Sequence, residues 1–165
     1  MIQHNMNDFI DEHGNLDCQK FKEIISEMIV RVSRNIGKPI SINQIEFVDR
    51  GIPHERPSEL PTGKRGVYMF YCPEEKCFLK IGKVGLKSKA RFCSQHYTFS
   101  SRSCLAKSLF NDKDVNYKFG KEDVGEWIMK HCHRIDILID ADLGPFANEL
   151  IEACLHYRFN PKYEG

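Results

Sequence analysis

The chain has 165 residues, of which 41% are hydrophobic and 28% are charged, and its formal net charge is +1 at pH 7. This composition is typical of a soluble globular protein. No apolar run is long enough to cross a bilayer, and the polar, acidic N-terminus is unlike a secretory signal, so we expect no membrane partner. The 7 cysteines are scattered and odd in number, which favours reduced thiols in a cytoplasmic protein.

An amphipathic helix is expected over residues 17–36. Asp17 can cap this helix, and Gly37 can end it. Its apolar residues recur at helical spacing, and they are Phe21, Ile24, Ile25, Met28, Ile29 and Val32. Such a stripe packs either on the chain's own core or against a second copy, so a homodimer through this segment is one of two interpretations.

An extended segment and a loop are expected between this helix and residue 60. Apolar residues indicate the extended segment, and they are Ile40, Ile42, Ile45 and Phe47. Prolines and glycines cluster between Asp49 and Lys64, which is typical of a loop. We therefore predict an N-terminal extension over residues 1–60 and a domain over residues 61–165.

A hairpin is predicted at the start of this domain. Residues 66–71 are β-branched and aromatic, as strands are, and residues 72–77 carry the proline and the polar cluster of a turn. Residues 78–81 run back as a second strand, which Gly82 and Gly85 end.

Helices and a third strand are predicted in the rest of the chain. The helices are expected over about 87–97 and 103–110, from Asp123 onwards, and between Gly144 and Pro161. Residues 134–139 alternate and then become fully apolar, which indicates a buried strand. The predicted fold class is therefore α/β of the α+β type, with a small three-stranded sheet flanked by helices.

A long window of the chain carries positive charge alone. Residues 76–111 contain no aspartate or glutamate, whereas lysines and arginines recur through them. Such a face can bind a phosphate backbone even on a nearly neutral protein, although a solvated surface is the alternative. We predict DNA as the partner, with RNA as an open alternative. The expected contacts are Lys83, Lys87, Lys89, Arg91, Arg102 and Lys107.

Two short motifs in this region resemble those of the GIY-YIG nucleases. Gly66-Val67-Tyr68 is similar to the first motif, and Lys80-Ile81-Gly82 is similar to the second, with lysine in place of tyrosine. The order of the two motifs makes the match more specific than either triplet alone. The resemblance implies a three-stranded antiparallel sheet and a metal-dependent endonuclease that cuts DNA.

The family also has an arginine on the helix after its second motif, a metal-binding glutamate on a later helix and a closing Pro-x-aromatic-Asn. Arg91 and Glu152 match the first two, and Pro161-Lys162-Tyr163 matches the closing motif. Glu164 stands where the family usually has asparagine. The resemblance covers about residues 60–165 and leaves the first third of the chain unexplained.

The resemblance implies a role for each of these residues in phosphodiester hydrolysis. Glu152 would bind one Mg²⁺ or Mn²⁺ ion, and Glu149, one turn earlier, is the alternative ligand. Arg91 would hold the scissile phosphate with its planar fork, and Lys83 would add charge beside it. Gly82 would let the backbone pass close to the site.

Tyr68 is the candidate for activating or positioning the attacking water. Neighbouring cations, Lys80 among them, are expected to lower its pKa, which is otherwise too high for a base. Because lysine replaces the second tyrosine, Lys80 is itself a catalytic candidate. His96 and Gln95 are two further candidates, and His96 can share a face with Arg91 only if the helix ends between them.

The sequence also allows other interpretations of these residues. A protein that keeps the fold but binds or regulates without cleaving is the main alternative, since Lys80 and Glu164 depart from the family pattern. Zinc held by Cys72 and Cys77 together with His131, Cys132 and His133 is another, although structural zinc motifs usually have tighter, repeated spacing.

Overall fold

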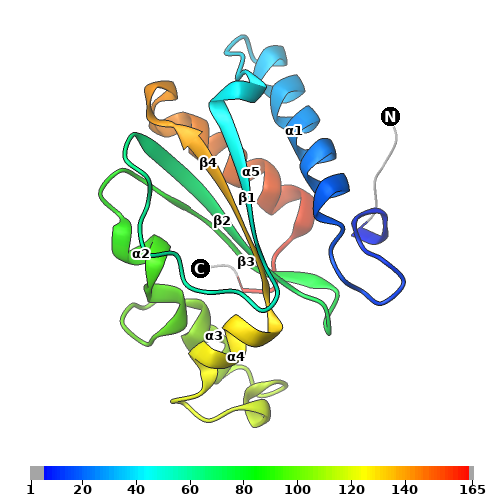
Figure 1. Ribbon diagram of the computed structural model, residues 1–165, viewed down its shortest axis with the longest axis vertical. Helices are drawn as coiled ribbons and strands as arrows, with labels where there is room; N and C mark the ends of the chain where they lie inside the picture. Colours follow the sequence, from blue (N-terminus) through cyan, green and yellow to red (C-terminus); the bar gives the residue numbers. More distant parts are fainter. Residues whose placement is uncertain (1–5, 164–165) are drawn as a thin grey trace.

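A four-stranded antiparallel sheet runs through the computed structural model, which describes residues 6–163 (Figure 1). In spatial order β1-β4-β2-β3, the strands are β1 (Ile45–Gly51), β4 (His133–Asp140), β2 (Lys64–Cys72) and β3 (Cys77–Val84). The α+β class is confirmed, whereas the prediction of three strands is wrong. The additional strand is β1, which pairs with β4 and comes from the segment expected to be an extension.

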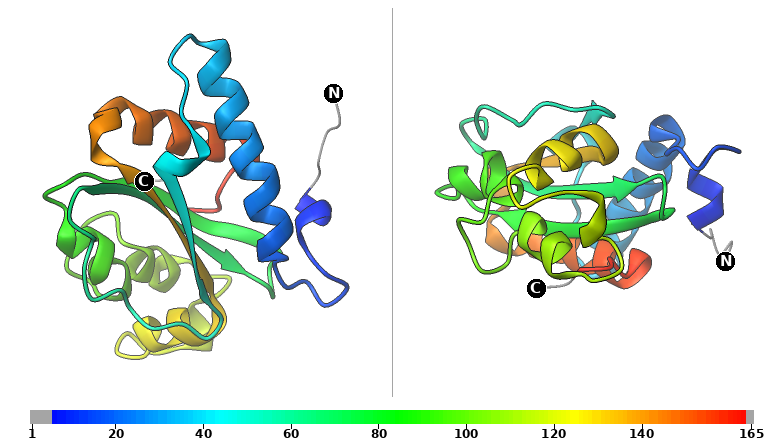
Figure 2. Two further views of the ribbon diagram at one scale, coloured as in Figure 1. Left: turned by 45° about the horizontal axis from the view of Figure 1, so that its top comes forward. Right: turned by 90° about the horizontal axis from the view of Figure 1, so that it is seen from below.

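Helices cover both faces of the sheet (Figure 2). They are α1 (Cys18–Asn35), α2 (Lys89–Cys93), α3 (Leu105–Asn111), α4 (Val124–His131) and α5 (Pro145–Phe159). Short 3₁₀ helices lie at Met6–Phe9, Ile42–Gln44, Gln95–Tyr97, Asn116–Lys118 and Ala141–Leu143. Within residues 6–163, no helix combines the length and the apolar character that crossing a bilayer requires.

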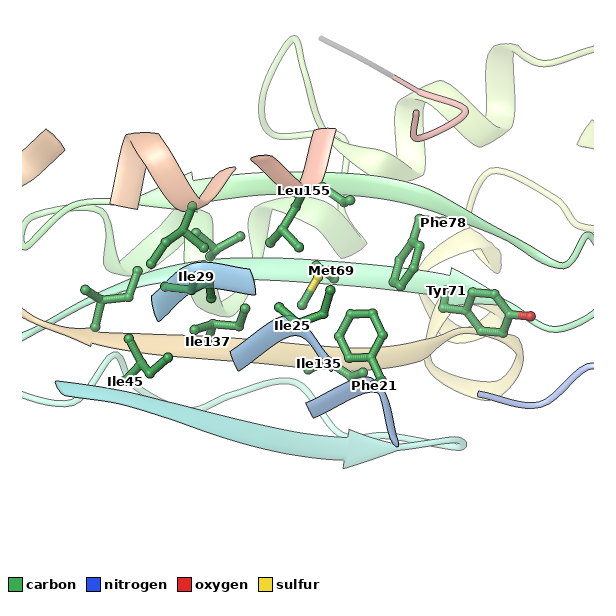
Figure 3. Close-up of a cluster of buried hydrophobic side chains, with 14 of the residues drawn as sticks. Phe21, Ile25, Ile29, Ile45, Met69, Tyr71, Phe78, Ile135, Ile137 and Leu155 are labelled. Carbon is green, nitrogen blue, oxygen red and sulfur yellow. The ribbon is translucent and has the colours of Figure 1, made fainter. Parts of the chain in front are cut away.

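Helices α1 and α5 pack on one face of the sheet. Asp17 caps α1 by accepting a hydrogen bond from the backbone of Lys20, as its sequence predicts. The apolar side of α1 then lies on the isoleucines of β4, as Figure 3 shows. Phe21, Ile25 and Ile29 are at most 3% exposed there. These three residues belong to the core of their own chain, so they are not available to bind a second copy.

Helices α2, α3 and α4 pack on the opposite face of the sheet. Their apolar residues form a second core with residues of β2 and β3, among them Phe92, Leu105, Leu109, Ile128, Tyr68, Phe70 and Leu79. Strand β4 is buried along almost its whole length because both cores cover it. Strand β3 is an edge of the sheet, and its far side is therefore open to other elements.

The predicted boundary at residue 60 falls between two strands of this one sheet. Strand β1 pairs with β4 from Ile45 to Gly51, with a register shift between Asp49 and Gly51. Ile45 also joins the same core as α1 and α5. The sheet and the core therefore continue across the boundary.

Candidate functional site

The ring of Tyr68 lies across the edge strand β3, directly over Gly82. The two residues are paired in the register of β2 and β3. A Cβ atom at position 82 would lie only 2.2 Å from the Tyr68 hydroxyl oxygen. Glycine is required here because any side chain would occupy the place of the tyrosine ring. The two family-like motifs thus meet through Tyr68 and Gly82.

Replacing Gly82 by alanine is expected to displace the Tyr68 ring. The free energy of unfolding should fall by about 1–3 kcal/mol, because the added methyl overpacks the site. A double-mutant cycle with Tyr68→Ala, measured by urea unfolding, checks this explanation. The loss caused by Gly82→Ala should shrink when the ring is absent, and equal losses in both backgrounds would show that the ring is not the cause.

Arg91 reaches the hydroxyl of Tyr68 from α2. Its Nε donates a hydrogen bond of 3.3 Å to the phenolic oxygen. Burial raises the pKa of Tyr68, and the positive charges of Arg91 and Arg134 only partly oppose this rise. The cations thus act in the expected direction, but the pKa of Tyr68 is raised overall, because this residue has no exposed surface and desolvation dominates. Tyr68 keeps its proton at neutral pH.

Lys83 and Glu152 form an ion pair beside Tyr68. Lys83 Nζ donates to Glu152 Oε2 at 2.8 Å, and this hydrogen bond raises the pKa of Lys83. The other carboxylate oxygen, Oε1, lies 3.9 Å from His156 Nε2. The side chain of Glu152 is 20% exposed, and it acts electrostatically on Tyr68. Glu149 is exposed one turn earlier on α5, where its charge also reaches Lys83.

His96, one of the two further candidates in this segment, packs against Tyr68 with the two rings tilted by 50°. Helix α2 ends at Cys93 and a 3₁₀ turn begins at Gln95, so the chain changes direction before His96. The His96 ring then lies 4.4 Å from that of Tyr68, centre to centre. Burial lowers the pKa of His96 to about 3, so the ring is neutral. Gln95 is half-buried and Lys80 is buried next to this ring.

The predicted nucleic-acid contacts differ in exposure. Lys87, Lys89 and Arg102 are exposed, and Lys107 is half-buried. Within residues 6–163, these four make no ion pair, unlike Lys83. Lys87 and Lys89 lie at the start of α2, next to Arg91, whereas Arg102 and Lys107 flank the beginning of α3. The positive charges of Lys87 and Lys89, next to Arg91, are thus available to bind an anion.

A buried ionic network beneath α2 was not predicted. Arg134 and Asp136 on β4 have no exposed surface and are joined by a hydrogen bond of 2.9 Å. Arg50 on β1 donates to the other oxygen of Asp136 at 2.7 Å. Arg134 also donates to the carbonyl oxygen of Phe92, which is the residue after Arg91. The network therefore fixes α2, and with it Arg91, against the sheet.

Tyr97 and His54 extend this network to the proline-rich loop. The hydroxyl of Tyr97 bonds both Arg134 Nη1 and His54 Nε2, each at 2.9 Å. His54 is held on its other side by the carbonyl oxygen of Cys132. Burial lowers the pKa of His54 to about 4. The signal in the sequence was the charged pair within the otherwise apolar strand at 134–139, because buried charges need partners.

The cysteines and histidines proposed as a zinc site lie elsewhere than expected. Cys72 and Cys77 face each other at the hairpin, and Cys72 is hydrogen-bonded to the buried Cys132. In the part of the chain that the structure describes, the single group of three metal-binding side chains is Cys18, Asp49 and His133. Only His133 belongs to the set that the sequence suggested.

The closing motif is partly visible. Pro161 is buried, and the hydroxyl of Tyr163 donates to Asp112 at 2.6 Å. The backbone of Lys162 and Tyr163 bonds to β3, so this segment lies along the edge strand. Glu164, which replaces the asparagine of the family, lies outside the described residues.

Comparisons with known proteins identify no relative of this chain. No protein-family model, curated protein or solved structure matches it. The resemblance to GIY-YIG nucleases therefore depends on the residues of the two motifs and on the side chains gathered around them.

Proposed function

We propose that this protein is a metal-dependent endonuclease of the GIY-YIG type that hydrolyses phosphodiester bonds in DNA. One observation carries the proposal: four side chains from four elements meet at the edge of β3. They are Tyr68 of β2, Lys83 of β3, Arg91 of α2 and Glu152 of α5, and they interact in two hydrogen-bonded pairs. These residue types supply a carboxylate for a cation, two positive groups for a phosphate and a hydroxyl for a water molecule.

Glu152 is the residue that would hold Mg²⁺ or Mn²⁺. Its Oε2 accepts from Lys83, and among the described residues its Oε1 has no partner closer than His156 Nε2 at 3.9 Å. A single carboxylate completed by waters and phosphate oxygens is an ordinary Mg²⁺ shell, so this donor set fits the ion. When bound, such an ion supplies positive charge to the phosphate oxygens.

Arg91 would bind the scissile phosphate. Its Nε donates to the Tyr68 hydroxyl, so the two terminal nitrogens of the guanidinium can make a bidentate contact with the phosphate. Lys83 would interact electrostatically with both Glu152 and the same phosphate. Tyr68, which keeps its proton, would orient a water or a phosphate oxygen by hydrogen bonding instead of removing a proton.

Removing divalent metal is expected to abolish cleavage. Supercoiled plasmid should be nicked in the presence of Mg²⁺ or Mn²⁺, should remain intact with EDTA, and should be nicked again when Mg²⁺ is restored in excess. The Arg91→Ala variant, purified in parallel, controls for contaminating nucleases. Nicking that persists in EDTA, or that is equal in this variant, would show that the assignment is wrong.

A nucleic-acid-binding protein without cleavage is the second candidate function. Two observations favour it: Tyr68 has no exposed surface, and the Glu152 carboxylate is already paired with Lys83. This candidate predicts binding of DNA or RNA that weakens steeply with salt, because Lys87, Lys89 and Arg102 would release counterions from the phosphates. Salt-dependent fluorescence anisotropy with labelled DNA and RNA, combined with intact plasmid under Mg²⁺ and Mn²⁺, would identify it.

A further inference from the structure

We propose that Cys18, Asp49 and His133 form a zinc site at the β1 side of the sheet. These residues come from the start of α1, from β1 and from the start of β4. Their sulfur, oxygen and nitrogen ligand atoms all lie within 4.8 Å of one another. Since β1 and β3 are opposite edges of the sheet, this site is separate from the one around Glu152.

The three side chains converge on a single point. His133 Nε2 lies 2.6 Å from Asp49 Oδ1 and 3.2 Å from Cys18 Sγ, so one ring nitrogen faces both groups. Zinc bonds of about 2.0–2.3 Å place tetrahedral ligand atoms about 3.3–3.6 Å apart. The sulfur–nitrogen distance is already close to this value. The oxygen must move away by about 0.7 Å. The Asp49 side chain is 51% exposed and has room for this movement, which lengthens the hydrogen bond that Oδ1 accepts from the backbone amide of Gly51.

The chemistry of the ligands favours zinc over magnesium. Thiolate and imidazole groups bind borderline metals such as Zn²⁺, whereas Mg²⁺ prefers oxygen ligands only. A thiolate and a carboxylate together also balance the two positive charges of the ion. Cys18 and Asp49 line a pocket of about 330 Å³, which has room for a water molecule as the fourth ligand. Three protein ligands with a water in the fourth position are the arrangement that catalytic zinc sites use.

Such an ion would fasten α1 to the sheet. The site links residues 31 and 115 positions apart along the chain, from Cys18 to Asp49 and from Cys18 to His133. Asp49 and His133 also precede Arg50 and Arg134, which hold the buried Asp136. Binding of zinc should therefore stabilise the folded state.

Titration of the full chain with Zn²⁺ tests the proposal after bound metal has been stripped with a chelator. Calorimetry should give one Zn²⁺ per chain, and Co²⁺ used as a probe should show the absorption of a thiolate ligand. The melting temperature should rise by about 5–10 °C at a hundredfold excess of Zn²⁺ over the Kd. Cys18→Ser and His133→Gln should each weaken Zn²⁺ binding by at least about 100-fold. A loss of this size equals the largest one expected for residues that only orient metal ligands, so it indicates direct ligands.

Two controls separate this site from other sources of binding. Cys154→Ser removes a half-buried thiol from α5, away from the proposed site, and should not change Zn²⁺ binding. Asp49→Asn alters an exposed side chain, so it keeps the fold and should still weaken binding about tenfold. Undiminished Zn²⁺ binding by Cys18→Ser or Asp49→Asn, or no thiolate absorption with Co²⁺, would overturn the proposal.

Discussion

Replacing Glu152 by glutamine is expected to reduce the rate of metal-dependent DNA nicking by at least about 10³-fold. The loss of one carboxylate removes the ligand proposed for Mg²⁺, and a catalytic ion contributes several kcal/mol to the reaction. The amide has nearly the same shape, and the shorter of the two ion pairs that Glu152 makes within the described residues is with the half-exposed Lys83, so the fold should persist. Single-turnover nicking at saturating Mg²⁺ measures the change, with circular dichroism to verify folding.

Glu149→Gln provides the matched control for this prediction. Glu149 lies on the same helix, is exposed and has the same charge, but it makes no hydrogen bond or ion pair within the described residues. This variant should nick plasmid at nearly the wild-type rate. If Glu149→Gln abolishes nicking while Glu152→Gln retains it, the two glutamates have been assigned the wrong roles. Equal activity of both variants and the wild type would remove the carboxylate from the proposed mechanism.

Replacing Asp136 by alanine is expected to lower the free energy of unfolding by about 3–5 kcal/mol. Asp136 is the shared partner of Arg50 and Arg134, and Arg134 has no exposed surface. The substitution would leave a guanidinium charge buried without its counter-ion. Because Arg134 also bonds the backbone of Phe92, α2 and Arg91 should lose their fixed position, and nicking should fall as well. Urea unfolding monitored by circular dichroism gives the free energy.

Asp140→Ala on the same strand is the control for Asp136. Asp140 pairs with Lys64 at 2.7 Å, but the two side chains are 37% and 25% exposed. Water screens this pair, so its loss should cost less than about 1 kcal/mol. If the free energy of unfolding falls by a similar small amount in both variants, the buried network does not stabilise the fold and only helps to specify it.

The local elements of this protein follow from the sequence. Asp17 caps α1 and Pro145 starts α5 because these residues satisfy or avoid the unpaired amides of a first helical turn. The strands at 64–72 and 133–140 are visible in runs of β-branched and aromatic residues. The hairpin follows as well, whereas the pairing of Tyr68 with Gly82 does not, because β3 continues past the predicted end at Gly82 to Val84 and a register shift between Phe70 and Tyr71 sets the pairing.

The arrangement of distant segments was decided by the tertiary structure. β1 joins the sheet by pairing with β4, from Ile45 opposite Ile139 to Gly51 opposite Arg134, and no local pattern distinguishes a segment with such a distant partner from a free extended segment. The position of His96 depended on where α2 ends, and in the folded chain the His96 ring packs against Phe70 of β2, with 5.6 Å between the ring centres.

Burial also decided the chemistry of several side chains. The sequence suggested that cations would lower the pKa of Tyr68, but the core around the ring raises it, because desolvation depends on every neighbour in space. The same holds for Asp136, whose two arginines come from separate strands, and for Cys18, Asp49 and His133, which meet only when α1 packs on the sheet. Charges and ligands of this kind are recognisable in a sequence by type, whereas their partners are determined by the folded chain.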